Sequence, residues 1–316
     1  MKILANDGIS QSGIDALTKD GFEVVTVKVA NEQLVNFINE NDIIGLLVRS
    51  ATTVDKTVID NCPNLKLIGR GGVAMDNIEV DYAREKGLHV IHTPTASSES
   101  VAELVFAHLY GGVRFLYDAN RNMPLDGDSK FKQLKKSYAQ GTELRGKTLG
   151  IIGFGRIGQA TARIALGIGM KVVFFDPLVE TASVTVSFYD EQTVDFNLKG
   201  VSKEDVLQQS DFVTVHVPKQ KAYVIGKPEF NIMKQNSAII NVARGGVIDE
   251  VALIDALENK KLMFAALDVY ESEPTPEIKI LMNPNISLTP HIGAATIDAQ
   301  DRIGVDLAKQ IATLLK

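Results

Sequence analysis

A glycine-rich motif between an apolar segment and a helical segment constrains the fold of this chain more than any other feature. The apolar run Leu149–Ile152 leads into Gly153-x-Gly155-x-x-Gly158, and apolar residues at helical spacing follow within residues 157–165. In this context Gly153 permits a tight turn, Gly155 lets the backbone approach a pyrophosphate, and Gly158 lets the helix pack closely on a sheet. The helix N-terminus then faces the phosphates. We therefore predict a βαβ unit that binds a dinucleotide.

An acidic residue, Asp176, ends the next apolar run, 18 residues after Gly158. A carboxylate at this place hydrogen-bonds the ribose hydroxyls of NAD and repels the 2′-phosphate of NADP. A glycine-rich turn that binds no ligand is the alternative, but the strand, the helix and the acid together favour a cofactor site. The expected cofactor is NAD.

Short apolar runs alternate with helix-period segments along most of the chain. This alternation predicts βα units and parallel sheets, with about five strands in a first unit that ends near residue 95. Apolar residues at helical spacing over residues 101–116 predict one long helix, and the lysine-rich segment 122–140 has the composition of a linker. A second series of strands spans residues 147–291, and within it the piece around the strand-like run Thr185–Phe188 has no firm assignment.

The predicted fold class is α/β, with two doubly wound parallel-sheet domains and a cleft between them. The first, flavodoxin-like domain is expected to comprise residues 1–97 and the closing helical segment 295–316, and it would bind the substrate. The second, Rossmann domain is expected to comprise residues 98–294 and would bind NAD.

Composition and charge exclude several other classes of protein. With 45% apolar and 23% charged residues the chain is globular, and its net charge of −6 is spread along the sequence, which argues against nucleic-acid or membrane-surface partners. Cys62 is the only cysteine and shows no metal-ligand spacing, so we expect neither an internal disulfide nor a metal site. The N-terminus lacks the pattern of a signal peptide and no run reaches about 18 apolar residues, so a cytoplasmic location is expected.

Three ionisable residues come directly after predicted strands of the second series: Arg244, Glu273 and His291. Open α/β sheets bind ligands at the carboxyl ends of their strands. In a hydride transfer between an alcohol and a carbonyl, a side chain must carry the hydroxyl proton, and histidine changes charge near neutrality. An ionised Glu273 would favour the imidazolium form and orient the ring, and Arg244 is a forked donor suited to a carboxylate. The set predicts a dehydrogenase of 2-hydroxy acids.

Each of the three residues also has a simpler interpretation. His291 follows a proline and could cap a turn, Glu273 could be a solvated loop acid, and Arg244 could be a surface charge beside two glycines. His216 is expected to line the cofactor cleft through its backbone. The remaining histidines are interpreted as structural, among them His89, His92 and His108.

Four ordered motifs make nearly the whole chain similar to the D-isomer-specific 2-hydroxyacid dehydrogenases: Gly146–Gly158, Asn241–Asp249, Leu267–Pro274 and Thr289–Thr296. The resemblance implies that Arg244, Glu273 and His291 form a catalytic triad, that Asp268 contacts the nicotinamide amide, and that the C-terminal helix completes the first domain. The cofactor contacts expected in total are Gly153, Gly155, Arg156, Ile157, Gly158, Asp176, His216, Val217, Pro218, Val242, Ala243, Arg244, Asp268, His291 and Gly293.

Within this family the chain is most similar to the branch that oxidises D-3-phosphoglycerate to 3-phosphohydroxypyruvate, the first step of serine biosynthesis. Arg49 and Ser50 match the phosphate-binding positions of that branch, although Arg49 could instead form a salt bridge at a strand end. Glu273 stands where the related formate dehydrogenases carry glutamine, which argues against formate. The expected substrate contacts are Arg49, Ser50, Arg70, Gly72, Val73, Arg244 and His291.

Departures from the family pattern at Ala74, Ser97 and Lys219–Tyr223 bear on the substrate. A glycerate or hydroxypyruvate reductase, or another D-2-hydroxyacid dehydrogenase, is therefore an alternative, and an NAD(H)-sensing protein similar to a corepressor is a non-enzymatic one. The expected partners are a 2-hydroxy or 2-oxo acid, in the leading prediction a phosphorylated one, and a second copy of the chain in a homodimer, or in a tetramer. The sequence ends at Lys316, so serine feedback through a C-terminal regulatory domain is not expected.

Overall fold

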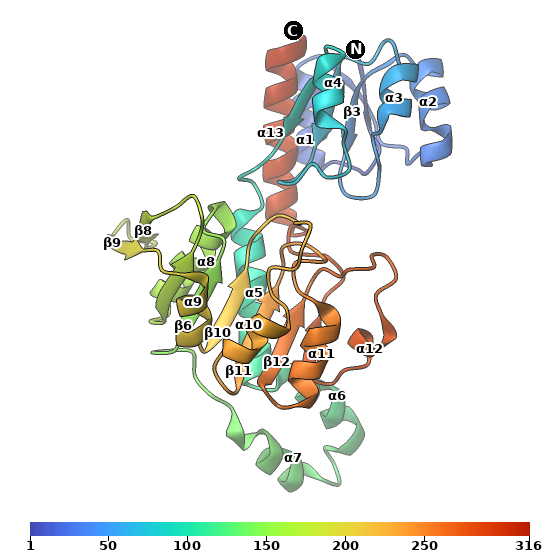
Figure 1. Ribbon diagram of the computed structural model, residues 1–316. Coiled ribbons are helices and arrows are strands. Elements are labelled where there is room, and N and C mark those ends of the chain that lie inside the picture. The colour runs from blue at the N-terminus through green and yellow to red at the C-terminus, as the bar shows by residue number, and fades with distance from the viewer. The chain divides into compact units, whose positions relative to one another are not determined.

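The computed structural model describes residues 1–316, and the chain forms two compact units. One unit consists of residues 1–100 together with residues 294–316, and the other of residues 101–293. Each unit is built around a parallel sheet with helices packed on it (Figure 1). None of the helices combines the length and the apolar character needed to cross a lipid bilayer.

The first unit has a five-stranded parallel sheet in the order β2-β1-β3-β4-β5. Its strands are β1 (Lys2–Ala5), β2 (Glu23–Val25), β3 (Ile43–Val48), β4 (Leu67–Arg70) and β5 (His89–His92). Its helices are α1 (Gln11–Lys19), α2 (Asn31–Glu40), α3 (Lys56–Asn61), α4 (Val80–Glu85) and α13 (Ile297–Leu315).

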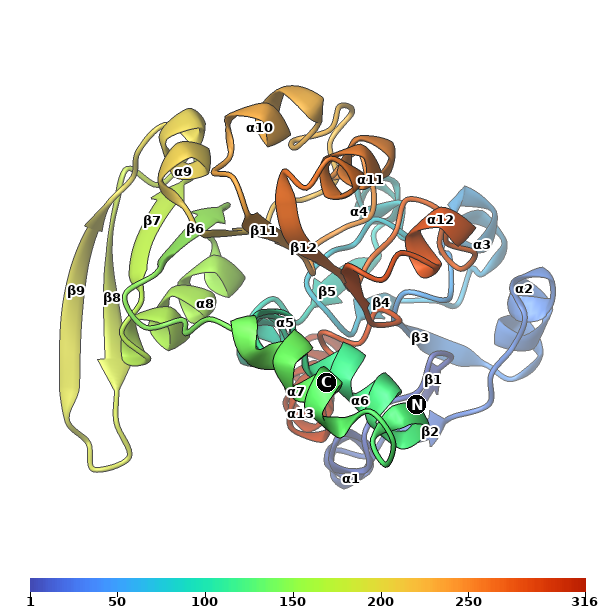
Figure 2. The same cartoon turned by 90° about the horizontal axis from the view of Figure 1, so that it is seen from below.

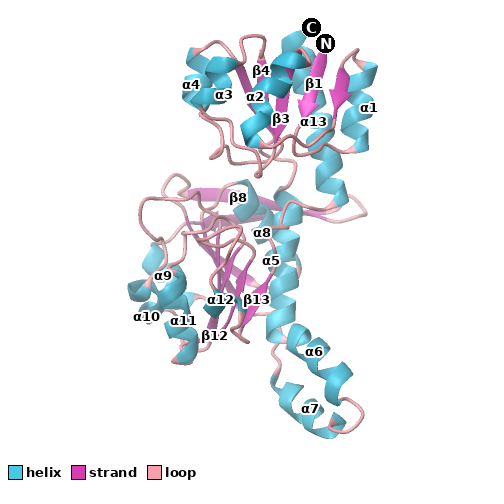
Figure 3. Ribbon diagram, turned by 90° about the vertical axis from the view of Figure 1, so that its right-hand side faces the viewer, coloured by secondary structure: helices cyan, strands magenta, loops and turns pink.

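Alternating side chains of β1 show why helices cover both faces of this sheet. Ile3 and Ala5 pack into an apolar cluster with residues of α1 and α13, whereas Leu4 packs into a second cluster with residues of α2, α3 and α4. Successive side chains of a strand point to opposite faces, so a strand that is apolar throughout needs cover on both sides. Figure 3 shows α13 and α1 along this sheet.

The second unit has a six-stranded parallel sheet in the order β13-β12-β11-β10-β6-β7. The strands are β6 (Thr148–Ile152), β7 (Lys171–Phe175), β10 (Phe212–Val215), β11 (Ser237–Asn241), β12 (Leu262–Leu267) and β13 (Ile286–Leu288). The helices near it are α5 (Ser98–Val113), α8 (Arg156–Gly167), α9 (Lys203–Gln209), α10 (Lys227–Ile232), α11 (Glu250–Glu258) and α12 (Ile278–Leu281).

The two faces of this second sheet are also covered. Val206, Phe230 and Leu253 bring α9, α10 and α11 into one apolar cluster with the strands. At Gly112, α5 passes so close to β12 that an added Cβ would lie 2.4 Å from the ring of Phe264. The two parallel sheets confirm the prediction of two doubly wound α/β domains.

An antiparallel hairpin, β8 (Thr181–Ser187) and β9 (Thr193–Lys199), occupies the part of the second unit that had no firm assignment. Val184 and Val186 are buried while the residue between them is exposed, so the hairpin is apolar on one face only. It lies beside α8 and β7 (Figure 2). The strand-like run was therefore correctly placed, but it ends at Ser187 and not at Phe188.

The predicted long helix is present as α5, but it ends at Val113 and not near residue 116, because the chain turns at Phe115 in the left-handed conformation, with φ of 55°. The interpretation of residues 122–140 as a linker is wrong. The segment interpreted as a linker contains α6 (Leu116–Asp126), α7 (Phe131–Ser137) and a short 3₁₀ turn (Tyr138–Gln140). These helices contain no buried residue, so their sequences lack the apolar periodicity that predicts a buried helix face.

Candidate active site

The glycine-rich loop between β6 and α8 has the geometry that its motif predicts. Gly153 has φ of 93°, and an added Cβ would lie 2.5 Å from the carbonyl oxygen of His216. A Cβ on Gly158 would lie 2.3 Å from the carbonyl oxygen of Gly153. At Gly155, the N-cap of the 12-residue helix α8, an added Cβ would meet nothing within 4 Å. Gly153 and Gly158 are needed because neighbouring backbone atoms leave no room for a side chain. Gly155 instead leaves open space at a helix N-terminus, which fits the approach of a pyrophosphate.

Asp176 follows β7 and is fixed beside this loop. Its Oδ2 accepts a hydrogen bond from the Phe154 amide at 2.7 Å, and its Oδ1 accepts one from the Leu178 amide at 2.8 Å. The Phe154 ring stacks on Phe174 of β7 with 3.8 Å between the ring centroids. Arg156 is exposed and Ile157 half-buried in the first turn of α8. The carboxylate thus stands at the strand end where an NAD ribose is expected.

His216 follows β10 and lies against the same loop. Its Nε2 lies 3.1 Å from Thr214 Oγ1 and 3.3 Å from Thr161 Oγ1, while its enclosed Nδ1 has no hydrogen-bond partner. Burial lowers the pKa of His216 to about 3, so the ring is neutral at physiological pH. Its backbone, together with Val217 and Pro218, forms the loop after β10.

Arg244 lies in the loop that follows β11, and that loop is held by Asn241. The Asn241 side chain donates to the Arg244 carbonyl at 2.9 Å and accepts from the Ala243 amide at 3.0 Å, while Val242 and Ala243 are buried. A Cβ on Gly245 would lie 1.7 Å from the Tyr270 carbonyl oxygen. Only glycine therefore lets this loop lie so close to the loop after β12.

Glu273 and His291 are brought together from the ends of β12 and β13. His291 Nδ1 lies 2.8 Å from Glu273 Oε2, and the Tyr270 amide donates to Glu273 Oε1 at 3.0 Å. The Glu273 and His291 side chains are 36% and 39% exposed, which leaves the His291 ring open to a substrate. His291 has φ of 56°, a left-handed conformation that is costly for a residue other than glycine. A paired Nδ1 on an accessible ring leaves Nε2 to serve as proton donor and acceptor.

Asp268, at the end of β12, is 1% exposed and is bound to the loop around His291. Its Oδ1 accepts from Thr289 Oγ1 at 2.6 Å and from the Ile292 amide at 2.8 Å, and its Oδ2 accepts from the Gly293 amide at 2.8 Å. Asp268 therefore has a structural task besides the nicotinamide contact that the family resemblance implies.

In the first unit, Arg49 and Arg70 come from the ends of the neighbouring strands β3 and β4. Asp7 accepts from the Arg49 amide at 2.6 Å, and Asn77 accepts from Arg70 Nε at 3.1 Å while it donates to the Arg49 carbonyl at 2.8 Å. Cβ atoms added at Gly71 and Gly72 would lie 3.5 Å from Arg49 Cγ and 3.0 Å from Arg70 Nη1. The two arginines thus flank a glycine pair, with Ser50 and Val73 exposed nearby in the sequence.

Five residues that the sequence did not single out hold these loops through hydrogen bonds: Asp7, Asn77, Asn241, Tyr270 and Thr289. Most of them follow or end strands, and this position was the signal that could have found them.

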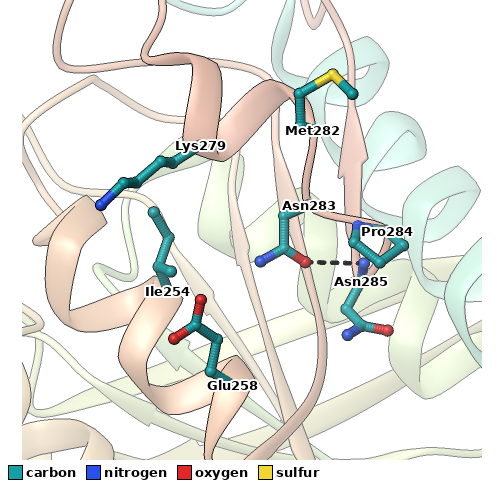
Figure 4. Close-up of a pocket in the computed structure, with 7 residues that line it drawn as sticks. All are labelled: Ile254, Glu258, Lys279, Met282, Asn283, Pro284 and Asn285. Atoms are coloured by element: carbon teal, nitrogen blue, oxygen red, sulfur yellow. Dashed lines mark hydrogen bonds between the residues drawn. The ribbon is translucent and has the colours of Figure 1, made fainter.

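A cavity of about 430 Å³ lies elsewhere in the second unit, between α11 and the segment after α12 (Figure 4). Its lining residues are Ile254, Glu258, Lys279, Met282, Asn283, Pro284 and Asn285. Asn285 directly precedes β13, so the cavity is at the amino end of that strand. The residues described above are at the carboxyl ends, so the cavity does not belong to their site.

Comparison with known proteins identifies the family. Residues 106–293 match the model of the D-isomer specific 2-hydroxyacid dehydrogenase, NAD binding domain. This chain belongs to that family, and the match confirms the prediction of NAD as the cofactor.

Two curated relatives and one solved structure are similar over the whole chain. A D-3-phosphoglycerate dehydrogenase of Methanocaldococcus jannaschii is 39% identical over 100% of this chain, which spans 58% of that relative's length. A hydroxypyruvate reductase of Thermotoga maritima is 38% identical over 98% of this chain and 97% of its own length. The crystal structure of the TT0316 protein from Thermus thermophilus has a TM-score of 0.85 at 28% identity, covering 100% of this chain and 97% of that one.

Proposed function

We propose that this protein is an NAD-dependent dehydrogenase of D-2-hydroxy acids. The observation that carries the proposal is the His291–Glu273 pair, in which Nδ1 is held at 2.8 Å and Nε2 is left for a substrate. This pair stands at strand ends of the unit whose glycine loop fits a dinucleotide. Family membership supports the same activity.

In the proposed mechanism, bound NAD supplies the hydride acceptor in oxidation and the hydride donor in reduction. His291 Nε2 takes the hydroxyl proton during oxidation and returns it during reduction, while Glu273 holds the ring and stabilises its charged form. Arg244 binds the substrate carboxylate through its guanidinium fork. These roles use one ring nitrogen for orientation and the other for proton transfer.

The residues proposed to hold the cofactor surround the glycine loop and the strand ends. The loop and α8 receive the pyrophosphate, Asp176 the adenosine ribose, and the loops after β10, β11 and β12 the nicotinamide half. The set is Gly153, Gly155, Arg156, Ile157, Gly158, Asp176, His216, Val217, Pro218, Val242, Ala243, Arg244, Asp268, His291 and Gly293.

We propose D-3-phosphoglycerate as the substrate, oxidised to 3-phosphohydroxypyruvate as the first step of serine biosynthesis. Arg49 and Arg70 flank the Gly71–Gly72 pair and would bind the phosphate together with Ser50 and Val73. The Methanocaldococcus relative is named a D-3-phosphoglycerate dehydrogenase, which supports this substrate, whereas the Thermotoga relative is named a hydroxypyruvate reductase, which supports the alternative.

Oxidation of NADH by the purified protein separates these substrates. We expect a higher kcat/KM with 3-phosphohydroxypyruvate than with hydroxypyruvate at matched concentrations and low phosphate, and Arg49→Gln should abolish this preference. An equal or reversed preference would assign an unphosphorylated 2-oxo acid. Absence of turnover with either acid, while NADH binds, would favour the corepressor-like alternative.

We also propose that α6 and α7 contact a second copy of the chain. The two helices extend away from the sheet of their unit (Figure 1), and none of their residues is buried. Three large apolar side chains, Leu116, Leu125 and Phe131, are more than half exposed. Apolar surface of this kind typically marks an interface. Sedimentation velocity should give a dimer that Leu125→Glu and Phe131→Glu together dissociate; an unchanged sedimentation coefficient would contradict this contact.

A further inference from the structure

His108 lies in the interior of α5, is only 4% exposed, and makes two side-chain contacts to the segment before His291. Its Nδ1 lies 2.8 Å from Ser287 Oγ in β13, and its Nε2 lies 3.1 Å from Thr289 Oγ1 just after that strand. A buried imidazole needs hydrogen-bond partners, so the identity of those partners decides what the ring can do. Both ring nitrogens are paired with hydroxyls that lie two residues apart.

The chemistry of the acceptors sets the direction of these hydrogen bonds. Asp268 Oδ1, as a carboxylate oxygen, can only accept, so the Thr289 hydroxyl donates to it at 2.6 Å. Thr289 Oγ1 must then accept from His108 Nε2–H. Burial lowers the pKa of His108 and favours the neutral ring, in which Nδ1 accepts from the Ser287 hydroxyl.

The same Asp268 carboxylate binds the amides of Ile292 and Gly293, which follow His291 directly. On the other side of His291, the Tyr270 hydroxyl donates to the Thr289 carbonyl at 2.8 Å. The left-handed backbone of His291 is therefore held from both sides. His108 ties this system to α5 through hydrogen bonds.

We propose that His108 is a positioning residue that, through Thr289 and Asp268, holds the loop Thr289–Gly293 in the conformation where His291 meets Glu273. The consequence for activity rests on the proposed function of His291. The effect on the loop does not, and it can be measured in the protein without cofactor.

Three variants of His108 separate hydrogen bonding from space filling. His108→Gln can place an N–H donor near the position of Nε2 and keep the bond to Thr289, His108→Asn reaches only toward Ser287, and His108→Leu keeps volume without hydrogen bonds. We expect kcat to fall roughly tenfold in the leucine and asparagine variants, with KM within about twofold, and to recover largely in the glutamine variant. His89→Gln, at an exposed histidine of β5, is the matched control for the substitution itself.

Nuclear magnetic resonance supplies a readout besides activity. The Nδ1–H proton of His291, hydrogen-bonded to Glu273, should give a low-field signal that persists in His108→Gln and broadens or disappears in His108→Leu. If wild-type protein turns over no 2-oxo acid, the proposed function fails, while this signal still tests the positioning of His291.

Thr289→Val gives a second route in case His108→Leu does not fold. Because both residues act through one chain of hydrogen bonds, the losses of kcat and of the His291 signal in Thr289→Val should match those of His108→Leu, and combining Thr289→Val with His108→Asn should add little. Equal Tm losses in all His108 variants with an unchanged His291 signal would overturn the proposal, as would full additivity with Thr289→Val.

Discussion

His291 Nδ1 and Glu273 Oε2 lie 2.8 Å apart, although the two residues follow different strands of the sheet. The pair depends on a third residue, because the Tyr270 amide binds the other oxygen of Glu273 and the Tyr270 hydroxyl binds the carbonyl of Thr289. Tyr270 thus holds both partners from one position, and burial raises the pKa of its hydroxyl to about 12, so that it remains a donor. The geometry of the pair is a property of the loops after β12 and β13 acting together.

Replacing the two partners should reveal which one transfers the proton. We expect His291→Ala to lower kcat by roughly 100-fold or more, as for loss of a general acid and base, with NADH affinity retained. Glu273→Gln keeps a hydrogen bond to the ring but removes the charge, so a loss of roughly tenfold is expected. Since Glu273 acts through His291, the double variant should be no slower than His291→Ala. Additive losses in steady-state kinetics would show that Glu273 acts independently.

Arg244→Lys should raise KM for the 2-oxo acid steeply, because a lysine ammonium cannot reproduce the two parallel hydrogen bonds of a guanidinium to a carboxylate. The dissociation constant of NADH, measured by fluorescence titration, should change little. Arg84→Lys, on the exposed face of α4, is the control. An unchanged KM would remove Arg244 from carboxylate binding.

Asp176→Ser should relax the preference for NAD over NADP. The change removes the negative charge beside the glycine loop and leaves one hydroxyl for the amides of Phe154 and Leu178. The ratio of kcat/KM for NADH and NADPH measures the effect, and Asp190→Ser in the β8–β9 turn should leave this ratio as it is in the wild type. If Asp176→Ser leaves the preference for NADH over NADPH unchanged, another group binds the ribose hydroxyls.

The parallel sheets and the charged residues at their ends could be predicted from the sequence, because both leave local signals. Apolar runs such as Leu149–Ile152 predict buried strands. Shortly after such runs come three ionisable residues, Arg244, Glu273 and His291. The helices α6 and α7 leave no such signal, since none of their residues is buried. Hydrophobic periodicity therefore does not predict helices of this kind.

The hydrogen bonds that position the site could not be predicted in the same way. His108 and Ser287 are 179 residues apart in the sequence, and only the packing of α5 against β12 and β13 brings them together. The Tyr270 hydroxyl likewise binds the carbonyl of Thr289 across two loops whose strands, β12 and β13, are neighbours only in the folded sheet. A single sequence predicts which groups can react more readily than which groups hold them.

The buried ring of His216 should make the protein less stable in acid. In the unfolded chain a histidine takes up a proton near pH 6.5, whereas burial lowers the pKa of His216 to about 3 in the folded state. The unfolded state therefore binds more protons below pH 6.5, and the free energy of unfolding should fall there by up to about 1.4 kcal/mol per pH unit from this ring. Above that pH this contribution is constant. Urea denaturation at a series of pH values between about 7.5 and 5 measures the slope.

His216→Asn should reduce that slope, while His89→Asn, at an exposed histidine, should leave it as it is in the wild type. If the His216 variant does not fold, ring proton shifts of the wild-type protein serve instead. His216 should show no titration down to about pH 5. A His216 signal that titrates near pH 6.5 in folded protein would contradict the burial argument.

Two alanine substitutions in the glycine loop should separate cofactor binding from folding. In Gly155→Ala the new methyl group meets nothing in the protein, so stability should fall by less than about 1 kcal/mol, the usual cost of alanine at an N-cap. The same methyl enters the space left for the pyrophosphate, so NADH affinity should drop at least tenfold. In Gly158→Ala the methyl would lie 2.3 Å from the Gly153 carbonyl oxygen, and a loss of about 1–3 kcal/mol of stability is expected. Urea unfolding measures the stability of both variants, and NADH fluorescence titration measures their affinity for the cofactor. An unaltered NADH affinity in a folded Gly155→Ala protein would place the pyrophosphate elsewhere.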